Sequence, residues 1–445
     1  MRQLYSWSWV EAEVARTIEV WNGSAAHPAQ RGPQYSLKGQ QKREKAYDEG
    51  LRAVEREARR TPRSRAERLK AQDRITASFA RFSASALDLP DEAVKLLTDD
   101  FLPAGTTLAR WARRFDPNLS FADITQACRN AWTACGLQPL LGVRVGITPA
   151  ILGYSLLYPY SDNYLDRQDV SAEAKLRFSQ RFRDRLRGES SVALDDREAA
   201  LSKLVGLVEG QYPRARYPQV FDCLLAIHRA QERSIAQVRS FRACEDAELL
   251  LMSCAKGGSS VLADACLARG WLSTEESQFS FDWGVLLQLG DDLQDVQEDM
   301  QRGSVTLFSR AAALGRSLDD LVVQLLGFSA RVGSRMDDLP HGTKLLKELM
   351  KMSWRSLIIG AVANSHQFFS PAFLKEAERC SPFRFEFLRA RRDRLTSRQG
   401  LYALLFDAFL EAPEGDDGEI PLPDYRESSY SEAGLEPVGS AGGVI

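Results

Sequence analysis

The chain has 445 residues and a formal net charge of -2 at pH 7, which excludes an overall attraction to nucleic acid or to anionic membranes. Hydrophobic residues make up 44% of it and charged residues 27%, a balance typical of globular proteins and not of long disordered chains. We therefore expect a globular protein without a nucleic-acid partner, with one large core or two to three domains.

The cysteines and the N-terminal sequence predict a cytoplasmic protein. None of the seven cysteines forms a C-x-x-C pair, and several lie in apolar helical patterns, where a free thiol packs as a small hydrophobic group. The opening sequence MRQLYSWSWVEAEVART has no apolar signal core. No run approaches the ~18 apolar residues that span a bilayer. We expect no transmembrane segment, leave peripheral membrane contact through a lipid product open, and leave a homodimer open.

Apolar residues recur at spacings of three and four along most of the chain, which predicts an all-α fold. The Lys/Arg-rich stretch 38–74 predicts a helical hairpin broken near Thr61-Pro62, either a solvated surface pair or a basic patch for phosphate or anionic lipid. Further helices are expected at 121–135, from Thr148-Pro149 onward, and at 220–242, 245–269, 277–302, 317–333, 342–369 and 383–410.

The composition predicts three regions. Residues 1–115 are expected to form an N-terminal helical extension that is partly charged, and residues 116–410 a helical domain, to which the resemblance described below assigns catalysis. Residues 411–445 are rich in Pro, Gly, Ser and acidic side chains, which predicts a disordered tail.

The first candidate site is the segment Asp162-Asn163-Tyr164-Leu165-Asp166-Arg167-Gln168-Asp169. Its aspartates, at i, i+4 and i+7, are predicted to share one helix face. Like charges at that spacing repel, so a helix does not gather them for stability. They are either an exposed acidic turn or ligands of Mg²⁺, which prefers hard oxygen ligands and substrate phosphates. The apolar stretch from Ile151 to Tyr158 would place them at the mouth of an apolar pocket.

The second candidate site runs from Gln288 to Asp299. Asp291, Asp295 and Asp299 follow at i, i+4 and i+8, with Asp292 beside them. An apolar stripe on the same helix borders these acids, so part of their surface is expected to be desolvated. Such carboxylates are costly without counter-charge. A divalent metal is the simplest explanation, and a plain solvated face is the alternative.

Two acidic helices in one chain predict metal ions that share an anionic ligand. A diphosphate bridging Mg²⁺ ions fits this description, because the ions neutralise the leaving group as its C–O bond breaks. The apolar helices around it would hold a hydrocarbon chain. The four histidines lack the spacing of di-iron or zinc sites, and no nucleotide-binding glycine loop is present.

Both segments resemble motifs of the class I isoprenoid synthase superfamily, over roughly residues 120–370. Asp162-Asn-Tyr-Leu-Asp166 is similar to its DDxxD motif, with Asn in the second place. The sequence LQLGDDLQDVQED at 287–299, followed by Arg302-Gly303, is similar to the squalene and phytoene synthase signature, and its first part to the QxxDDxxD of chain-elongating prenyltransferases. The acids also keep the spacing of the terpene synthase NSE/DTE motif.

The resemblance implies a helical bundle with a central cavity, an isoprenyl diphosphate substrate and three Mg²⁺ ions. It implies that Asp162, Asp166 and Asp295 are catalytic. Gln288 is expected to contact the substrate. The implied metal ligands are Asp162, Asp166, Asp169, Asp291, Asp292, Asp295 and Asp299.

Basic residues near the second motif are expected to bind the diphosphate. Lys256 lies in the mid-helix sequence Ala255-Lys-Gly-Gly-Ser-Ser260, where a Gly-Gly pair costs about 2 kcal/mol against Ala. Either a kink beside the ligand or close helix packing would offset that cost. Arg302 follows the acidic helix, and loop arginines can bind phosphate in a bidentate manner. Two further candidates precede the Lys256 helix, namely Arg239 and Arg242.

Within the superfamily, the sequence favours a terpene synthase. The GGKRxRP segment and the paired arginines after DDxxD, both typical of chain elongation, are missing. The Arg-Tyr dyad of microbial terpene synthases is not evident either. A squalene or phytoene type of head-to-head prenyltransferase is the main alternative, and a chain-elongating synthase or a non-catalytic lipid-binding helical bundle follow.

Overall fold

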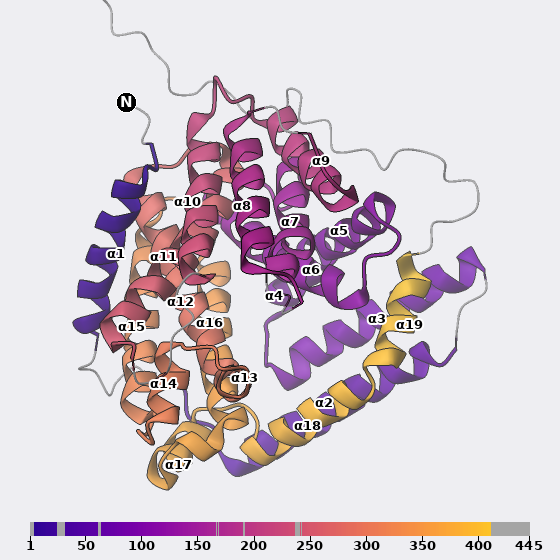
Figure 1. The fold of residues 1–445 in the computed structure, drawn as a ribbon. Helices are drawn as coiled ribbons and strands as arrows, with labels where there is room; N and C mark the ends of the chain where they lie inside the picture. Colours follow the sequence, from indigo (N-terminus) through magenta and orange to yellow (C-terminus); the bar gives the residue numbers. More distant parts are fainter. Residues whose placement is uncertain are drawn as a thin grey trace, which may run out of the picture. The chain divides into compact units, whose positions relative to one another are not determined.

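The computed structural model describes residues 4–24, 32–60, 64–165, 167, 169–189, 192–235, 241 and 243–410. Every regular element in these ranges is a helix and none is a strand, which confirms the predicted all-α fold (Figure 1). The described residues belong to one compact unit. The predicted disordered tail lies outside the described residues.

Five helices build the centre of the fold: α6 (Phe121–Leu140), α7 (Pro149–Leu165), α10 (Pro218–Ile235), α11 (Asp246–Arg269) and α12 (Thr274–Gln294). Helix α11 is the central helix of this group, because it contacts each of the other four. Its side chains from Gly257 to Ala268 are nearly all buried, as expected for a helix that is apolar all round.

The remaining helices enclose this centre. They are α1 (Trp7–Asn22), α2 (Leu37–Ala58), α3 (Arg65–Ala86), α4 (Asp91–Lys95), the π-helical turn η2 (Leu96–Phe101), α5 (Leu102–Phe115), α8 (Ala172–Arg187), α9 (Asp196–Gln211), α13 (Val296–Arg302), α14 (Leu307–Ala313), α15 (Asp319–Asp338), α16 (Lys344–Asn364), the 3₁₀ turn η3 (His366–Phe368), α17 (Pro371–Arg379), α18 (Phe385–Ser397) and α19 (Gln399–Leu410).

Helices α11 and α12 approach each other closely through glycine. A Cβ added to Gly257 would lie 2.5 Å from the backbone oxygen of Gly284, and one added to Gly284 would overlap the carbonyl of Gly257. A Cβ on Gly258 would enter the ring of Phe281. Because α11 runs unbroken through this Gly-Gly pair, the pair serves close packing and not a kink, the other explanation open from the sequence.

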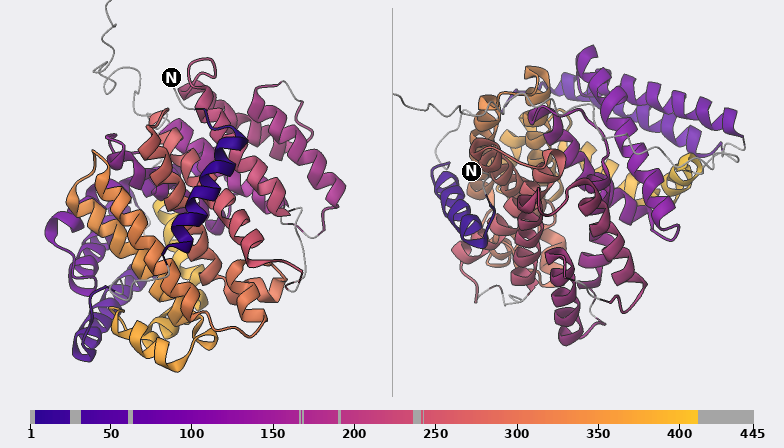
Figure 2. Two further views of the ribbon diagram at one scale, coloured as in Figure 1. Left: turned by 90° about the vertical axis from the view of Figure 1, so that its left-hand side faces the viewer. Right: turned by 90° about the horizontal axis from the view of Figure 1, so that it is seen from above.

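Helix α1 packs onto the central helices instead of extending away from them (Figure 2). The Tyr5 hydroxyl lies 2.7 Å from Ser277 Oγ, at the start of α12. The fully buried carboxylate of Asp282 accepts hydrogen bonds from Arg16 and Thr17 of α1 and from Arg335 of α15. A functional division at residue 115 stays a prediction.

The predicted charged hairpin is confirmed as α2 and α3, but one side of α2 is buried. Its acids pair with arginines of α18, as in Glu44 with Arg384 at 2.7 Å and Glu55 with Arg394 at 2.6 Å. Helices α2 and α18 run side by side in Figure 1. Lysines such as Lys42 remain exposed, so a basic patch on this hairpin is still an open alternative to a solvated surface.

The predicted helices are present, but several of their ends differ: α6 continues to Leu140 beyond the predicted 135, α15 continues to Asp338 beyond 333, and α10 is described to Ile235 where 242 was predicted. Three predicted helices are also interrupted. The stretch 277–302 is two helices, because α12 ends at Gln294 and α13 begins at Val296. The stretch 383–410 is likewise divided at Arg398, and the helix of 342–369 ends at Asn364 before the short turn η3. Gly303, at φ 74°, ends α13 where the Arg302-Gly303 pair predicted a stop.

All seven cysteines are buried, as expected of thiols that pack as small apolar groups. A search of the described helices for one that is long and apolar enough to cross a bilayer returned none.

The close contact at Gly284 predicts that two Gly→Ala substitutions differ widely in their effect on the free energy of unfolding. Gly284→Ala should lower the free energy of unfolding by about 2–3 kcal/mol, since the added methyl group overlaps backbone that has no room to move. Gly360→Ala in α16 meets nothing within 4 Å and should be neutral or stabilising by up to about 1 kcal/mol. Urea unfolding of both variants checks this, and equal stabilities would show that α11 and α12 are not held this closely.

Candidate functional site

The second acidic segment spans the junction of α12 and α13. Asp291 and Asp292 lie in the last turn of α12, Asp295 lies between the helices, and Asp299 lies in α13. The backbone N–H of Asp295 donates to the backbone carbonyl oxygen of Asp291 at 2.9 Å, and that of Asp299 donates to the backbone carbonyl oxygen of Asp295 at 2.8 Å. The i to i+4 ladder therefore continues across the junction and keeps the three side chains in the expected row.

Asp292 is the buried member of the segment. One of its carboxylate oxygens accepts from Gln288 Nε2 and the other from Ser253 Oγ of α11, each at 2.8 Å. Burial raises the pKa of Asp292 to about 6, against the effect of these two hydrogen bonds. Gln288, predicted to contact the substrate, thus holds an acidic side chain in place.

The other three acids are partly accessible and still desolvated. Burial raises the pKa of Asp291, although 47% of its side chain is exposed. Burial, followed by the charges of Asp292, Asp295 and Glu298, raises the pKa of Asp299 to about 7.

Several cations lie near this row of acids. Lys256 of α11 lowers the pKa values of Asp291 and Asp292, against the effect of burial. Arg129 of α6 pairs with Asp291 at 3.4 Å. Arg302, predicted to bind diphosphate, pairs instead with Glu298, and 69% of its side chain is exposed. The charge of Arg392 of α18 also lowers the pKa of Asp295, against the larger effect of burial.

The first acidic segment departs from the prediction of three aspartates on one helix face. Asp162 lies in the last turn of α7, but the helix ends at Leu165. Asp169 lies beyond it, paired with Arg167, and that hydrogen bond holds the pKa of Asp169 at about 2. The placement of Asp169 on the helix was therefore wrong, because the chain leaves the helix before reaching it.

Helix α6 borders both acidic segments. Near its N-terminus, Asp123 accepts a hydrogen bond from Asn163 of the first segment at 2.9 Å. Six residues further on, Arg129 contacts Asp291 of the second segment. Six helical residues rise by about 9 Å. The same half of α6 thus has a member of each segment beside it, and a site shared by the two segments stays a prediction.

The fit of a metal to these residues depends on their donor chemistry. Within the described ranges, no three His, Cys, Asp or Glu side chains are already close enough to hold an ion. The donors that do gather are carboxylates, the hard oxygen ligands that Mg²⁺ prefers, and Mg²⁺ commonly uses only one or two of them plus phosphate oxygens. Asp166, Arg239 and Arg242 lie outside the described residues.

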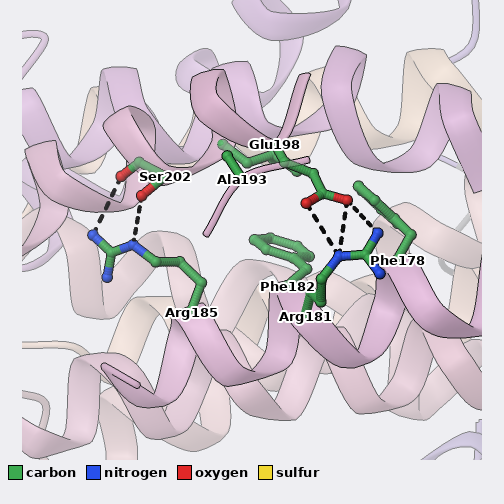
Figure 3. A pocket seen from close by; sticks show the side chains of 8 residues that line it. Phe178, Arg181, Phe182, Arg185, Ala193, Glu198 and Ser202 are labelled. Carbon is green, nitrogen blue, oxygen red and sulfur yellow. Dashed lines mark hydrogen bonds and ion pairs between the residues drawn. The ribbon is translucent and has the colours of Figure 1, made fainter. Parts of the chain in front are cut away.

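Two recesses elsewhere contain none of the predicted site residues. One, of about 20 Å³, lies between α8 and α9, where Arg181 pairs with Glu198 and Arg185 with Ser202 (Figure 3). The other is an open cleft of about 730 Å³ lined by Tyr160, Arg197 and Lys203, among others. Its Tyr160 comes from α7, two residues before Asp162, so this cleft and the first acidic segment share one helix end.

Arg129 and Arg392 are the charged residues near the site that sequence reasoning missed. Neither stands next to an acidic motif in the sequence, and each comes near the acids through helix packing alone. Comparison of the chain with family models, curated proteins and solved structures returned no match. The proposal of a function therefore depends on the residues of the site.

The crowding of acids predicts that the metal-free protein becomes more stable when Asp299 loses its charge. The folded-state pKa of about 7 lies above the ordinary value near 4, so ionisation of Asp299 weakens the fold, fully so above about pH 7. In a chelator at about pH 8, Asp299→Asn should raise the unfolding temperature, and the gain should shrink toward about pH 5. A lower unfolding temperature for the variant at the higher pH would contradict this account.

Proposed function

We propose that the protein is a class I type of terpene synthase, which ionises an isoprenyl diphosphate with Mg²⁺, releases diphosphate and forms a terpene product. The observation that carries this proposal is the row of acids Asp291, Asp292, Asp295 and Asp299. Burial raises the pKa of each, and the charge of a neighbouring acid raises it further. The nearby cations lower these pKa values without returning them to the ordinary range, so a ligand that neutralises the acids explains their presence best.

The residues that would hold Mg²⁺ are the acids with accessible oxygens, Asp162 on one side and Asp291, Asp295 and Asp299 on the other. When bound, the metal would neutralise charge on the diphosphate as it departs. Asp292 differs from them because it is buried and each of its oxygens accepts one hydrogen bond, from Gln288 or from Ser253, so we expect it to hold the row in position. Asp166 stays a predicted ligand on its sequence spacing, whereas Asp169 pairs with Arg167 and is a weaker candidate.

Lys256 and Arg129 are the cations best placed to bind diphosphate oxygens. Lys256 comes from α11 and Arg129 from α6, so they approach Asp291 from two different helices. A fixed positive charge aimed at a leaving group stabilises it most as the bond ionises, because negative charge builds there. Arg302 points to Glu298 on its own helix and would have to turn away from it before it could reach a phosphate.

The hydrocarbon chain would lie against the apolar side of α7. Of that helix, Ile151, Leu152 and Leu156 are buried and Tyr154 is partly buried, all on the N-terminal side of Asp162. An aromatic and aliphatic wall beside the charged end excludes water, which would otherwise capture a carbocation.

The proposal predicts Mg²⁺-dependent release of diphosphate from at least one isoprenyl diphosphate in a series of increasing chain length. Asp295→Asn should lower kcat by about 100-fold or more, because it removes a charge that the transition state depends on. Asp338→Asn removes an exposed acid at the end of α15 and should leave kcat unchanged.

Diphosphate release and product identity are measured together. One substrate consumed per product supports a terpene synthase, whereas two joined head to head would assign the squalene type. Binding of isoprenoids without release at any metal concentration would assign the non-catalytic lipid-binding bundle and reject an enzyme.

The two predicted phosphate-binding residues should differ in their effect. Lys256→Gln should lower kcat by about 100-fold and weaken inhibition by inorganic diphosphate. Arg302→Gln should have a clearly smaller effect, since its side chain is exposed and paired with Glu298. Lys42→Gln, an exposed lysine of α2, serves as the control. An unchanged diphosphate affinity with altered products in Lys256→Gln would place that residue along the hydrocarbon chain.

A further inference from the structure

Helix α11 carries a polar row that leads away from the acidic segments into the protein. Lys256, Ser260 and Asp264 follow at i, i+4 and i+8, so they share one face of the helix. At one end of the row, the charge of Lys256 lowers the pKa values of Asp291 and Asp292, against the larger effect of burial. Eight residues rise by about 12 Å, so Asp264 lies well inside the fold from Lys256. The proposed function assigns nothing to this inner end.

Asp264 is the most unusual member of the row. Its side chain is 1% exposed, and its Oδ2 atom has no hydrogen-bond partner in the described part of the chain. Burial raises the pKa of Asp264 well above its ordinary value. A buried polar group without a partner weakens the fold, and such groups in native proteins call for an explanation.

Two further polar groups lie next to Asp264. The Tyr154 hydroxyl of α7 is 3.4 Å from both the backbone oxygen and the Oγ of Ser260, which are long contacts. Ser260 is one helical turn from Asp264, and the charge of Asp264 contributes to raising the pKa of Tyr154, after burial. Ser155 and Ser259, on the same two helices, are also buried without a hydrogen-bond partner for their hydroxyl groups.

Tyr154 and Ser260 are both only partly buried, whereas their neighbours Ser155 and Ser259 are fully buried. A small polar group bound between α7 and α11 would lie beside the hydroxyls of Tyr154 and Ser260. With hydroxyl and carboxyl groups around it, such a group would find both donors and acceptors.

We propose that Asp264, Tyr154 and Ser260 form a polar subsite that binds an oxygen atom at the end of the isoprenoid chain opposite its diphosphate. This inference rests on the proposed function and adds a substrate class to it: a linear isoprenyl diphosphate with a terminal hydroxyl group. The carboxyl of Asp264 and the hydroxyls of Tyr154 and Ser260 form the hydrogen bonds to that oxygen. The separation from Lys256 requires an elongated ligand and not a compact one.

The test compares plain and terminally hydroxylated isoprenyl diphosphates of equal carbon number, with wild type, Asp264→Asn and Asp264→Leu. Wild type should favour the hydroxylated substrate in kcat/KM by about tenfold or more, the worth of one well-made hydrogen bond. Asp264→Leu should lose this preference while still releasing diphosphate from the plain chain. Asp264→Asn keeps an N–H donor and should retain part of the preference.

A second measurement distinguishes a role of Asp264 in substrate recognition from a purely structural role. Without substrate, Asp264→Leu should unfold at a higher temperature than wild type, because it removes an unpartnered buried carboxyl. A lower unfolding temperature with unchanged substrate preference would make Asp264 structural and overturn the proposal.

The remaining outcomes distinguish this inference from the proposed function. Equal kcat/KM for both substrates in wild type rejects the subsite and leaves the terpene synthase proposal intact. Products from the plain chain that contain oxygen from isotopically labelled water, lost in Asp264→Leu, would assign the cluster to a bound water and reject a substrate oxygen. No diphosphate release from either substrate rejects the proposed function, and this inference with it.

Discussion

The close packing of α11 against α12 is the constraint on which the rest of the site depends. At Gly257, Gly258 and Gly284 neither helix leaves room for a side chain, so the two backbones nearly touch. This contact fixes the positions of residues within about two turns of it on each helix, where Ser253 donates to Asp292 and Lys256 lies near Asp291. A larger separation would detach the cation and the hydroxyl from the acids, so the glycines are part of the electrostatics of the site as well as of the fold.

Much of the helical architecture could be predicted from the sequence, because apolar periodicity and end signals act locally. The Ser120 cap with Asp123 at the start of α6, and Gly303 after α13, are such signals. Interruptions inside a helix were harder to predict. Nothing in the alternation of residues 288–299 marks Asp295 as a junction, since the backbone hydrogen bonds continue across it. The prediction that Asp169 lies on the helix was wrong for the opposite reason, because residue spacing alone cannot show that a helix has already ended.

The candidate site was only partly predictable from the sequence. Acids four residues apart on one helix can be read from spacing, as with Asp291 and Asp295, but partners from distant helices cannot. Arg129 and Arg392 meet the acids through tertiary packing, and no local pattern distinguishes them from other surface arginines. Asp264 was missed as well, because a single acid in an apolar helix gives no sign of whether it finds a partner.

The central claim is that the two acidic segments bind one shared metal and diphosphate cluster. The most direct measurement is a crystal structure of the protein with Mn²⁺, in place of Mg²⁺, and inorganic diphosphate, with the metal located by anomalous scattering. The account predicts ions between the two segments, bound by Asp162 on one side and by Asp291 or Asp295 on the other, with diphosphate oxygens completing their shells and Lys256 on the diphosphate. Ions confined to one segment, or diphosphate bound elsewhere without metal, would contradict it.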